Sequence, residues 1–158
     1  MRTIQTNIFE FDELSEAAKE NARSWYREGQ TFFWFDDYLA SINTFCAEFG
    51  VKVTDYALGD GRGCFIDTDA TNANFRGLKL ADYNKESTPT GFCADSDLLY
   101  PFFDTFKTTG DALQAFKDAI ESIQHTIRRD IEASNSDEQV DENLSINDYE
   151  FTSEGVRA

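Results

Sequence analysis

Residues 111–133 read DALQAFKDAIESIQHTIRRDIEA, and this stretch decides the fold. Its apolar side chains recur at the three- and four-residue spacing of one helix face. They are Leu113, Phe116, Ile120, Ile123, Ile127 and Ile131, and the polar residues Asp118, Glu121, Arg128 and Glu132 fall between them. The sequence therefore predicts one long amphipathic helix with a buried face on which other elements pack.

The next stretch, SNSDEQVDENLSINDYE (residues 134–150), holds six acidic side chains and no lysine or arginine. Its first residues are typical of a helix break, and Val140 and Leu144 are spaced to anchor a second, short helix. Tyr149 and Phe151 alternate with polar residues, which predicts a last strand. A disordered acidic tail rarely spaces apolar residues so regularly, so we expect an ordered helix and strand with their carboxylates facing outward.

Two further helices are expected near the start of the chain. Ser15 is a suitable N-cap for the first, and Gly29 is a stop signal. The second lies within residues 31–50, where apolar residues again follow one stripe and Gly50 closes the segment. The two helices, within residues 16–49, are predicted to form a hairpin.

After residue 50, the spacing of hydrophobic residues changes from the helical period to that of β-strands. VKVTDYALG (51–59) and GCFIDTD (63–69) predict two strands joined by a glycine-rich turn. TIQTNIFEF (3–11) predicts a first strand, and FRGLKL (75–80) is a candidate for another. Residues 81–97 are rich in turn formers and predict an irregular surface loop, with a helix after Pro101.

These elements predict an α+β fold, in which a small, mainly antiparallel sheet packs on the helical hairpin and the long helix. A helix-dominated arrangement with a minor sheet is the alternative. We expect residues 1–158 to form a single domain, with residues 134–158 as an acidic helix and strand docked on it.

Size and composition limit the class of protein. A chain of 158 residues with 41% apolar content buries roughly 70% of its unfolded surface and needs no disulfide or metal to hold its core. No apolar run reaches about 18 residues, and the N-terminus lacks a signal-peptide core. Three cysteines without paired spacing favour free thiols and a cytoplasmic location.

The net charge of −16 is the strongest functional constraint, and it grows toward the C-terminus, where residues 111–158 carry 12 acids and four bases. This negative charge makes direct binding to nucleic acid or to an anionic membrane unfavourable, because binding to either requires basic side chains. A basic protein partner is favoured electrostatically. The simpler alternative is that the charge only keeps the protein soluble.

No motif nominates a reaction, a cofactor or a metal. The glycines of residues 59–63 precede a strand and fit a hairpin turn better than a phosphate loop. Residues 67–74 lack the glycine and glutamate of a calcium loop. His125 is the only histidine and has no positioned partner in the sequence, and Cys46, Cys64 and Cys93 lack zinc-ligand spacing.

The candidate binding residues are therefore carboxylates. Asp36 and Asp37, flanked by aromatic residues, form one expected acidic–aromatic patch, of the kind that anchors interfaces. The main expected patch lies near the C-terminus and contains Asp130, Glu132, Asp137, Glu138, Asp141, Glu142, Asp148 and Glu150.

Two segments carry a resemblance to a known group. IFEFDELSEAAKENA (8–22) and LSINDYEFTSEG (144–155) resemble the first and last segments of small acidic proteins encoded by phages and prophages, some of them labelled antitoxin-like. The resemblance implies an accessory protein that works in the cytoplasm of a bacterial host. It supplies no catalytic residues.

Three functions are compatible with these features. The first is a phage-encoded anti-defence inhibitor, of the anti-CRISPR or anti-restriction type, which binds a nucleic-acid-handling defence complex through a DNA-mimicking acidic face. The second is an antitoxin-like protein that neutralises one basic toxin. The third is a small enzyme acting on a nucleotide signal, with a pocket near Asp67, Asp69 and residues 59–63. The sequence favours the first over the second, and both over the enzyme.

Overall fold

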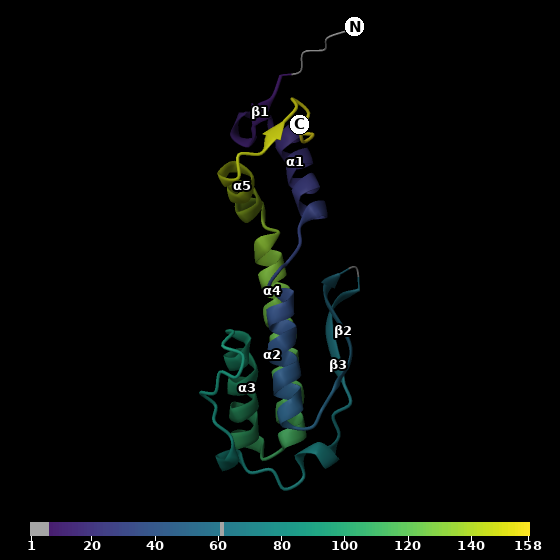
Figure 1. Ribbon diagram of the computed structural model, residues 1–158, viewed down its shortest axis with the longest axis vertical. Helices are drawn as coiled ribbons and strands as arrows, with labels where there is room; N and C mark the ends of the chain where they lie inside the picture. Colours follow the sequence, from purple (N-terminus) through teal and green to yellow (C-terminus); the bar gives the residue numbers. More distant parts are fainter. Residues whose placement is uncertain (1–6, 61) are drawn as a thin grey trace. The chain divides into compact units, whose positions relative to one another are not determined.

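A computed structural model describes residues 7–60, except for the side chain of Asp60, and residues 62–158. Helices and two antiparallel two-stranded sheets make up the protein, which confirms the α+β class (Figure 1). The chain divides into two compact units. We call residues 7–32 and 131–158 the terminal unit, and residues 33–130 the central unit. The expectation of a single domain stays a prediction.

The terminal unit is built from the two ends of the chain. Helix α1 (Glu16–Gly29) packs on helix α5 (Asp137–Ile146), and strand β1 (Phe9–Glu10) pairs antiparallel with strand β4 (Glu150–Phe151) (Figure 1). The predicted N-cap is confirmed, since the Ser15 hydroxyl accepts a hydrogen bond from the Ala18 amide at 3.3 Å. Residues 3–6 of the predicted first strand lie outside the described residues.

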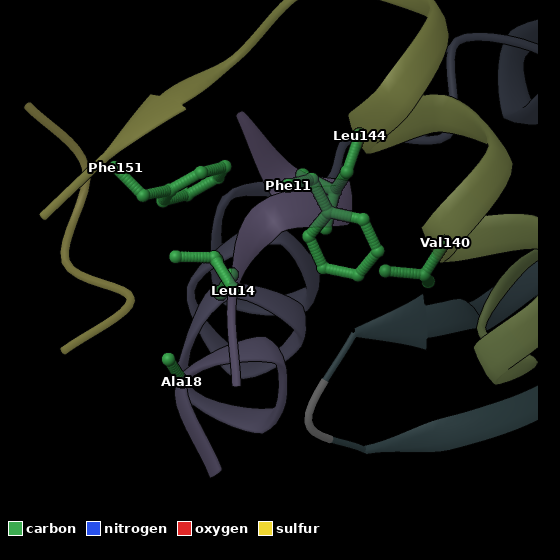
Figure 2. Close-up of a cluster of buried hydrophobic side chains, with 7 residues drawn as sticks. Phe11, Leu14, Ala18, Val140, Leu144 and Phe151 are labelled. Carbon is green, nitrogen blue, oxygen red and sulfur yellow. The ribbon is translucent and has the colours of Figure 1, made fainter. Parts of the chain in front are cut away.

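Apolar residues from both ends of the chain form the core of the terminal unit. Figure 2 shows Phe11, Leu14 and Ala18 facing Val140, Leu144 and Phe151. The three from the C-terminal segment have no exposed surface at all. Val140 and Leu144, the expected apolar anchors of this segment, are thus among the buried residues of the cluster.

The central unit is a bundle of α2 (Phe35–Glu48), α3 (Ala94–Thr109) and the part of α4 (Ala112–Ser134) that ends at Asp130. Its core is aromatic. The rings of Phe45 and Phe116 stack with their centres 5.4 Å apart. The ring centre of Phe102 lies 5.9 Å from that of Phe45 and 4.9 Å from that of Phe49. The predicted stripe of the long helix supplies Phe116, Ile120, Ile123 and Ile127 to the buried residues.

Strands β2 (Val53–Asp60) and β3 (Gly63–Thr68) form the predicted hairpin, which packs on α4. The Arg128 guanidinium donates to the Cys64 carbonyl at 2.8 Å, and the Cys64 thiol lies 3.5 Å from the Gln124 carbonyl. Burial raises the pKa of the Cys64 thiol, and it raises that of the Cys46 thiol to about 12. All three cysteines are free thiols, and Cys93 alone is exposed.

Two expected details are wrong. Residues 75–80 form no strand, because Gly77 adopts a φ of 75° and the segment winds into short 3-10 turns at Asn72–Phe75 and Leu80–Asp82. Helix α3 begins at Ala94, inside the expected loop, and contains Pro101 in its middle. Proline removes one helix hydrogen bond, but the buried Leu98 and Phe102 beside it hold the helix on its neighbours.

The expected hairpin of α1 and α2 stays a prediction, since the two helices belong to different units. Within the terminal unit α5 packs on α1, and within the central unit α3 packs on α2. The sequence pattern identified both helices but not the elements that cover them. None of the described helices is both long enough and apolar enough to cross a membrane.

Candidate partner-binding surface

The terminal unit carries more than half of the excess negative charge. Residues 1–32 and 131–158 contain 14 acidic and five basic residues, a net charge of −9 within a total of −16. Four of the five bases lie among the described residues, and each of them contacts groups of the same unit. The exposed charged groups of the described terminal unit are therefore mostly carboxylates.

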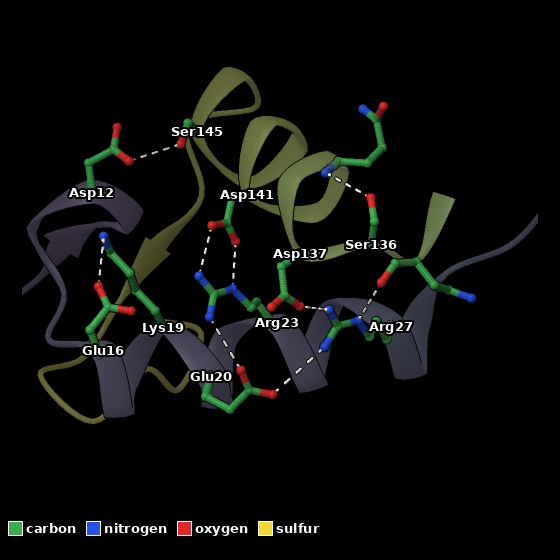
Figure 3. Close-up of polar contacts among 12 residues, drawn as sticks. Asp12, Glu16, Lys19, Glu20, Arg23, Arg27, Ser136, Asp137, Asp141 and Ser145 are labelled. Carbon is green, nitrogen blue, oxygen red and sulfur yellow. Dashed lines mark hydrogen bonds and ion pairs between the residues drawn. The ribbon is translucent and has the colours of Figure 1, made fainter. Parts of the chain in front are cut away.

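Two arginines of α1 join it to α5. The Arg23 guanidinium donates to both carboxylate oxygens of Asp141, from Nε at 2.6 Å and from its second terminal nitrogen at 2.8 Å, and Arg27 donates to Asp137 (Figure 3). Arg23 and Arg27 are four residues apart, as are Asp137 and Asp141, so the pairs form two successive rungs between the helices. We call them the charge ladder. Asp141 is the main cause of the raised pKa of Arg23.

Glu20 of α1 reinforces the ladder. Its carboxylate lies 3.3 Å from Arg23 and 3.8 Å from Arg27 (Figure 3). Arg27 also donates from Nε to the Asn135 carbonyl at 3.1 Å, at the junction between α4 and α5. The ladder therefore fixes both the register of α5 on α1 and the point where the chain enters α5. Asp137 and Asp141, expected to contact a partner, both form ion pairs within the terminal unit.

The outward side of α5 carries carboxylates that have no counterion among the described residues. Glu138 and Glu142 are exposed, lie one helical turn apart, and form no ion pair with any described residue. Ile146 continues the same spacing and is 68% exposed. We call Glu138, Glu142 and Ile146 the outer stripe.

Three more predicted residues belong to the terminal unit and are exposed. Glu132 lies near the end of α4 and Glu150 in β4, and Asp148 occupies the turn between α5 and β4 with a φ of 51°. A left-handed conformation is tolerated best by glycine, asparagine and aspartate. Asp148 thus has a backbone role in this turn besides its charge.

The remaining two bases of the described terminal unit, Lys19 and Arg157, also contact groups of the same unit. Lys19 lies 3.7 Å from Glu16, and its ammonium is 5.5 Å from the centre of the Phe11 ring. The Arg157 guanidinium lies 5.0 Å from the Trp25 ring centre and 4.9 Å from that of Tyr149. Sequence reasoning missed Arg157, because only the fold brings residue 157 beside Phe151 and α1.

The expected second patch lies in the central unit. Asp36 and Asp37 are exposed in the first turn of α2, where their negative charges interact favourably with the positive end of the helix dipole. Of the nearby aromatic residues, Tyr38 is buried at 2% exposure, whereas Phe33 is 86% exposed. Phe33 is therefore the large aromatic side chain that this patch presents to a partner.

Asp130, also predicted as a contact residue, accepts a hydrogen bond from the Tyr38 hydroxyl at 2.5 Å. Burial raises the pKa of Tyr38, and Asp130 raises it further. Burial also raises the pKa of Asp97 above its usual value, the charge of Asp130 adds to the shift, and Arg129 partly offsets it. Asp130 is thus part of a local carboxylate pair.

We expect Asp97→Asn to stabilise the protein at neutral pH. A raised carboxyl pKa means that the native state favours the protonated form, so the stabilising contribution of Asp97 is complete below its unfolded pKa and is lost as the pH rises through its folded pKa. Asparagine removes that loss, and the melting temperature at pH 7 should rise by roughly 1–2 °C. Calorimetry from pH 3 to pH 8 should show a gain that vanishes at the acidic end. A gain that is independent of pH would contradict this account.

The structure also places the other residues that the sequence analysis considered as catalytic or metal-binding groups. His125 is exposed on α4. Asp69 accepts a hydrogen bond from the Lys52 amide at 2.7 Å, which closes the end of the β2–β3 hairpin. Within residues 7–60 and 62–158, no cluster of histidine, cysteine or acidic side chains is arranged to hold a metal ion.

Comparison of the chain with protein-family models, with curated proteins and with solved structures finds no match.

Proposed function

We propose that the protein is a non-enzymatic inhibitor that binds the basic nucleic-acid-binding surface of another protein through its terminal unit. The outer stripe is the observation that carries this proposal. Its glutamates lack counterions among the described residues, while the described bases of the unit are engaged internally. A basic partner would supply the missing positive charges and gain a steered, fast association.

The fold supports presentation of this charge on a rigid surface. The charge ladder holds α5 in one register on α1, so Glu138 and Glu142 stay at fixed positions. Ordered carboxylates can take the places of phosphates in a basic channel, because lysine and arginine bind both groups with the same charge-assisted hydrogen bonds.

The partner class follows from the resemblance to phage and prophage proteins. We propose a defence complex that handles nucleic acid in the cytoplasm of a bacterial host. This partner binds DNA or RNA, whereas the protein itself carries too much negative charge to do so. The proposal concerns binding only and assigns no chemical step.

Reversal of the outer stripe tests the proposal. We expect Glu138→Lys/Glu142→Lys to weaken binding to the partner by about tenfold or more, because two attractive contacts become repulsive. The tagged wild-type protein and the variant would be used in parallel for affinity capture from bacterial lysate, with washes at low and at high salt. Captured proteins would be identified by mass spectrometry and then measured individually with each variant.

The matched control is Asp104→Lys/Glu121→Lys, which changes the net charge by the same amount at two exposed positions of the central unit. The control should retain the partner, and duplex DNA should displace the partner from the wild-type protein. A partner that the control loses equally would reflect net charge alone. A partner that salt releases but that nucleic acid does not displace would exclude mimicry and favour neutralisation of a basic toxin.

A further inference from the structure

A pocket in the central unit lies between α2, the loop that precedes α3, and α3 itself. Its volume is about 130 Å³. Cavities of about 150 Å³ hold a benzene molecule, so this pocket has room for roughly six non-hydrogen atoms. It lies in the unit that does not contain the outer stripe, and its residues have no part in the function proposed above.

The middle of the pocket is apolar. Phe45 and Phe49 of α2 and Leu99 of α3 line it. The ring of Tyr83 stacks on Phe49 with centres 5.5 Å apart and an interplanar angle of 28°. Flat rings and an aliphatic side chain form walls that suit a short hydrocarbon chain.

One end of the pocket contains a buried carboxylate that lacks a cation. Asp95 is 3% exposed and accepts hydrogen bonds from the Thr90 amide at 2.9 Å, the Gly91 amide at 3.0 Å and the Thr90 hydroxyl at 2.8 Å. None of these donors is charged, and no ion pair among the described residues includes Asp95. Asp95 thus places a hydrogen-bonded carboxylate without a counterion at this end of the pocket, and an ammonium group bound there would add a charge-assisted hydrogen bond.

The other end is also acidic. The exposed carboxylates of Glu48 and Asp82 line the pocket there. Burial raises the pKa of the Tyr83 hydroxyl, and the charges of Glu48 and Asp82 raise it further, which places both carboxylates near that ring. Among the residues that the structure describes, no lysine, arginine or histidine lines the pocket.

The two ends are separated along α2. Ser41 lies at the Asp95 end, because its hydroxyl is 2.8 Å from that of Thr90, which in turn donates to Asp95. Glu48 lies seven residues further on, about 10 Å along the helix axis. The pocket thus combines an apolar middle with negative charge at both ends.

We propose that this pocket binds a primary ammonium group on a short aliphatic chain. A chain of four or so carbons fills the apolar middle, and each ammonium meets carboxylates at an end of the pocket. The same chemistry is found in a free alkyl diamine and in the side chain of a lysine. A diamine satisfies both ends, whereas a lysine side chain satisfies one.

Titration followed by NMR tests the proposal with three probes at low salt: 1,4-diaminobutane, Nα-acetyl-lysine methylamide and 1-butanol. We expect saturable shifts of amides near Phe45, Tyr83 and Asp95 with at least one of the two ammonium probes and none with the neutral alcohol. Binding of the diamine alone identifies a free small molecule as the ligand. Binding of the lysine probe identifies a side chain of a partner protein. No saturable binding of either ammonium probe, or equal binding of butanol, would overturn the proposal.

Two variants separate the pocket from general acidity. Glu48→Gln/Asp82→Asn preserves the size of the side chains and should weaken ammonium binding by about tenfold. Asp104→Asn/Glu121→Gln removes the same charge elsewhere in the central unit and should leave the affinity unchanged. Equal affinity of wild type and Glu48→Gln/Asp82→Asn would show that the carboxylates do not recognise the ligand. Glu138→Lys/Glu142→Lys should retain ammonium binding, so failure of one proposal leaves the other standing.

Discussion

Replacement of Gly155 by alanine is expected to reduce the free energy of unfolding by about 4 kcal/mol. Gly155 has a φ of 78°, and a Cβ atom at this position would lie 1.9 Å from the carbonyl oxygen of Ala18. The contact is with helix backbone, which cannot give way without moving α1. The variant must therefore release the C-terminal turn from α1 or distort the helix.

Gly77→Ala is the matched control, because Gly77 has a φ of 75° and open space around it. It should cost about 1 kcal/mol, the conformational penalty alone. Urea denaturation would measure both variants, and hydrogen exchange would show whether the amides of α1 and α5 lose protection in Gly155→Ala. Equal losses in the two variants would show that the close approach to Ala18 does not limit this position.

The charge ladder is expected to hold the terminal unit together. We expect Arg23→Ala to lower the free energy of unfolding by about 2 kcal/mol, because Arg23 is 13% exposed, Asp141 is 33% exposed and their contact is bidentate. The Arg23–Asp141 double-mutant cycle should give a coupling energy of about 1 kcal/mol. Thermal and urea denaturation of the four proteins of the cycle would measure it.

Asp55 and Arg62 provide the comparison within the same protein. They lie 3.4 Å apart, and their side chains are 57% and 56% exposed. Solvent screens such a pair, so its coupling energy should stay below about 0.5 kcal/mol. A ladder pair no stronger than this one would mean that apolar packing alone, through Val140 and Leu144, holds α5 on α1.

The ladder also explains why the sequence predicted the site only in part. Asp137, Glu138, Asp141 and Glu142 are equivalent in a list of carboxylates, and all four were expected at the partner surface. The helix period separates them into two faces, and only the position of Arg23 and Arg27 shows which face is internal. Arg157 was overlooked for a similar reason, since its contacts with Trp25 and Tyr149 depend on how the chain ends meet.

The pocket of the central unit could not be predicted from the sequence. Asp95 was not among the predicted binding residues, and its loop was expected to continue through residue 97. Its burial depends on hydrogen bonds from Thr90 and Gly91, which start α3 earlier than the turn-rich composition indicated. Pro101 misled the prediction further, because proline more often opens a helix than continues one.

The sequence by itself determined the α+β class, the long helix, the β2–β3 hairpin and the anchoring of the acidic segment by Val140 and Leu144. These features depend on periodicity, capping and turn chemistry, which act over a few neighbouring residues. Only the tertiary structure decided that α1 packs on α5, that α2 packs on α3, and which carboxylates are left without a counterion. Such pairings join residues far apart in the sequence, 118 positions in the case of Arg23 and Asp141, and local sequence patterns carry no information about partners at that separation.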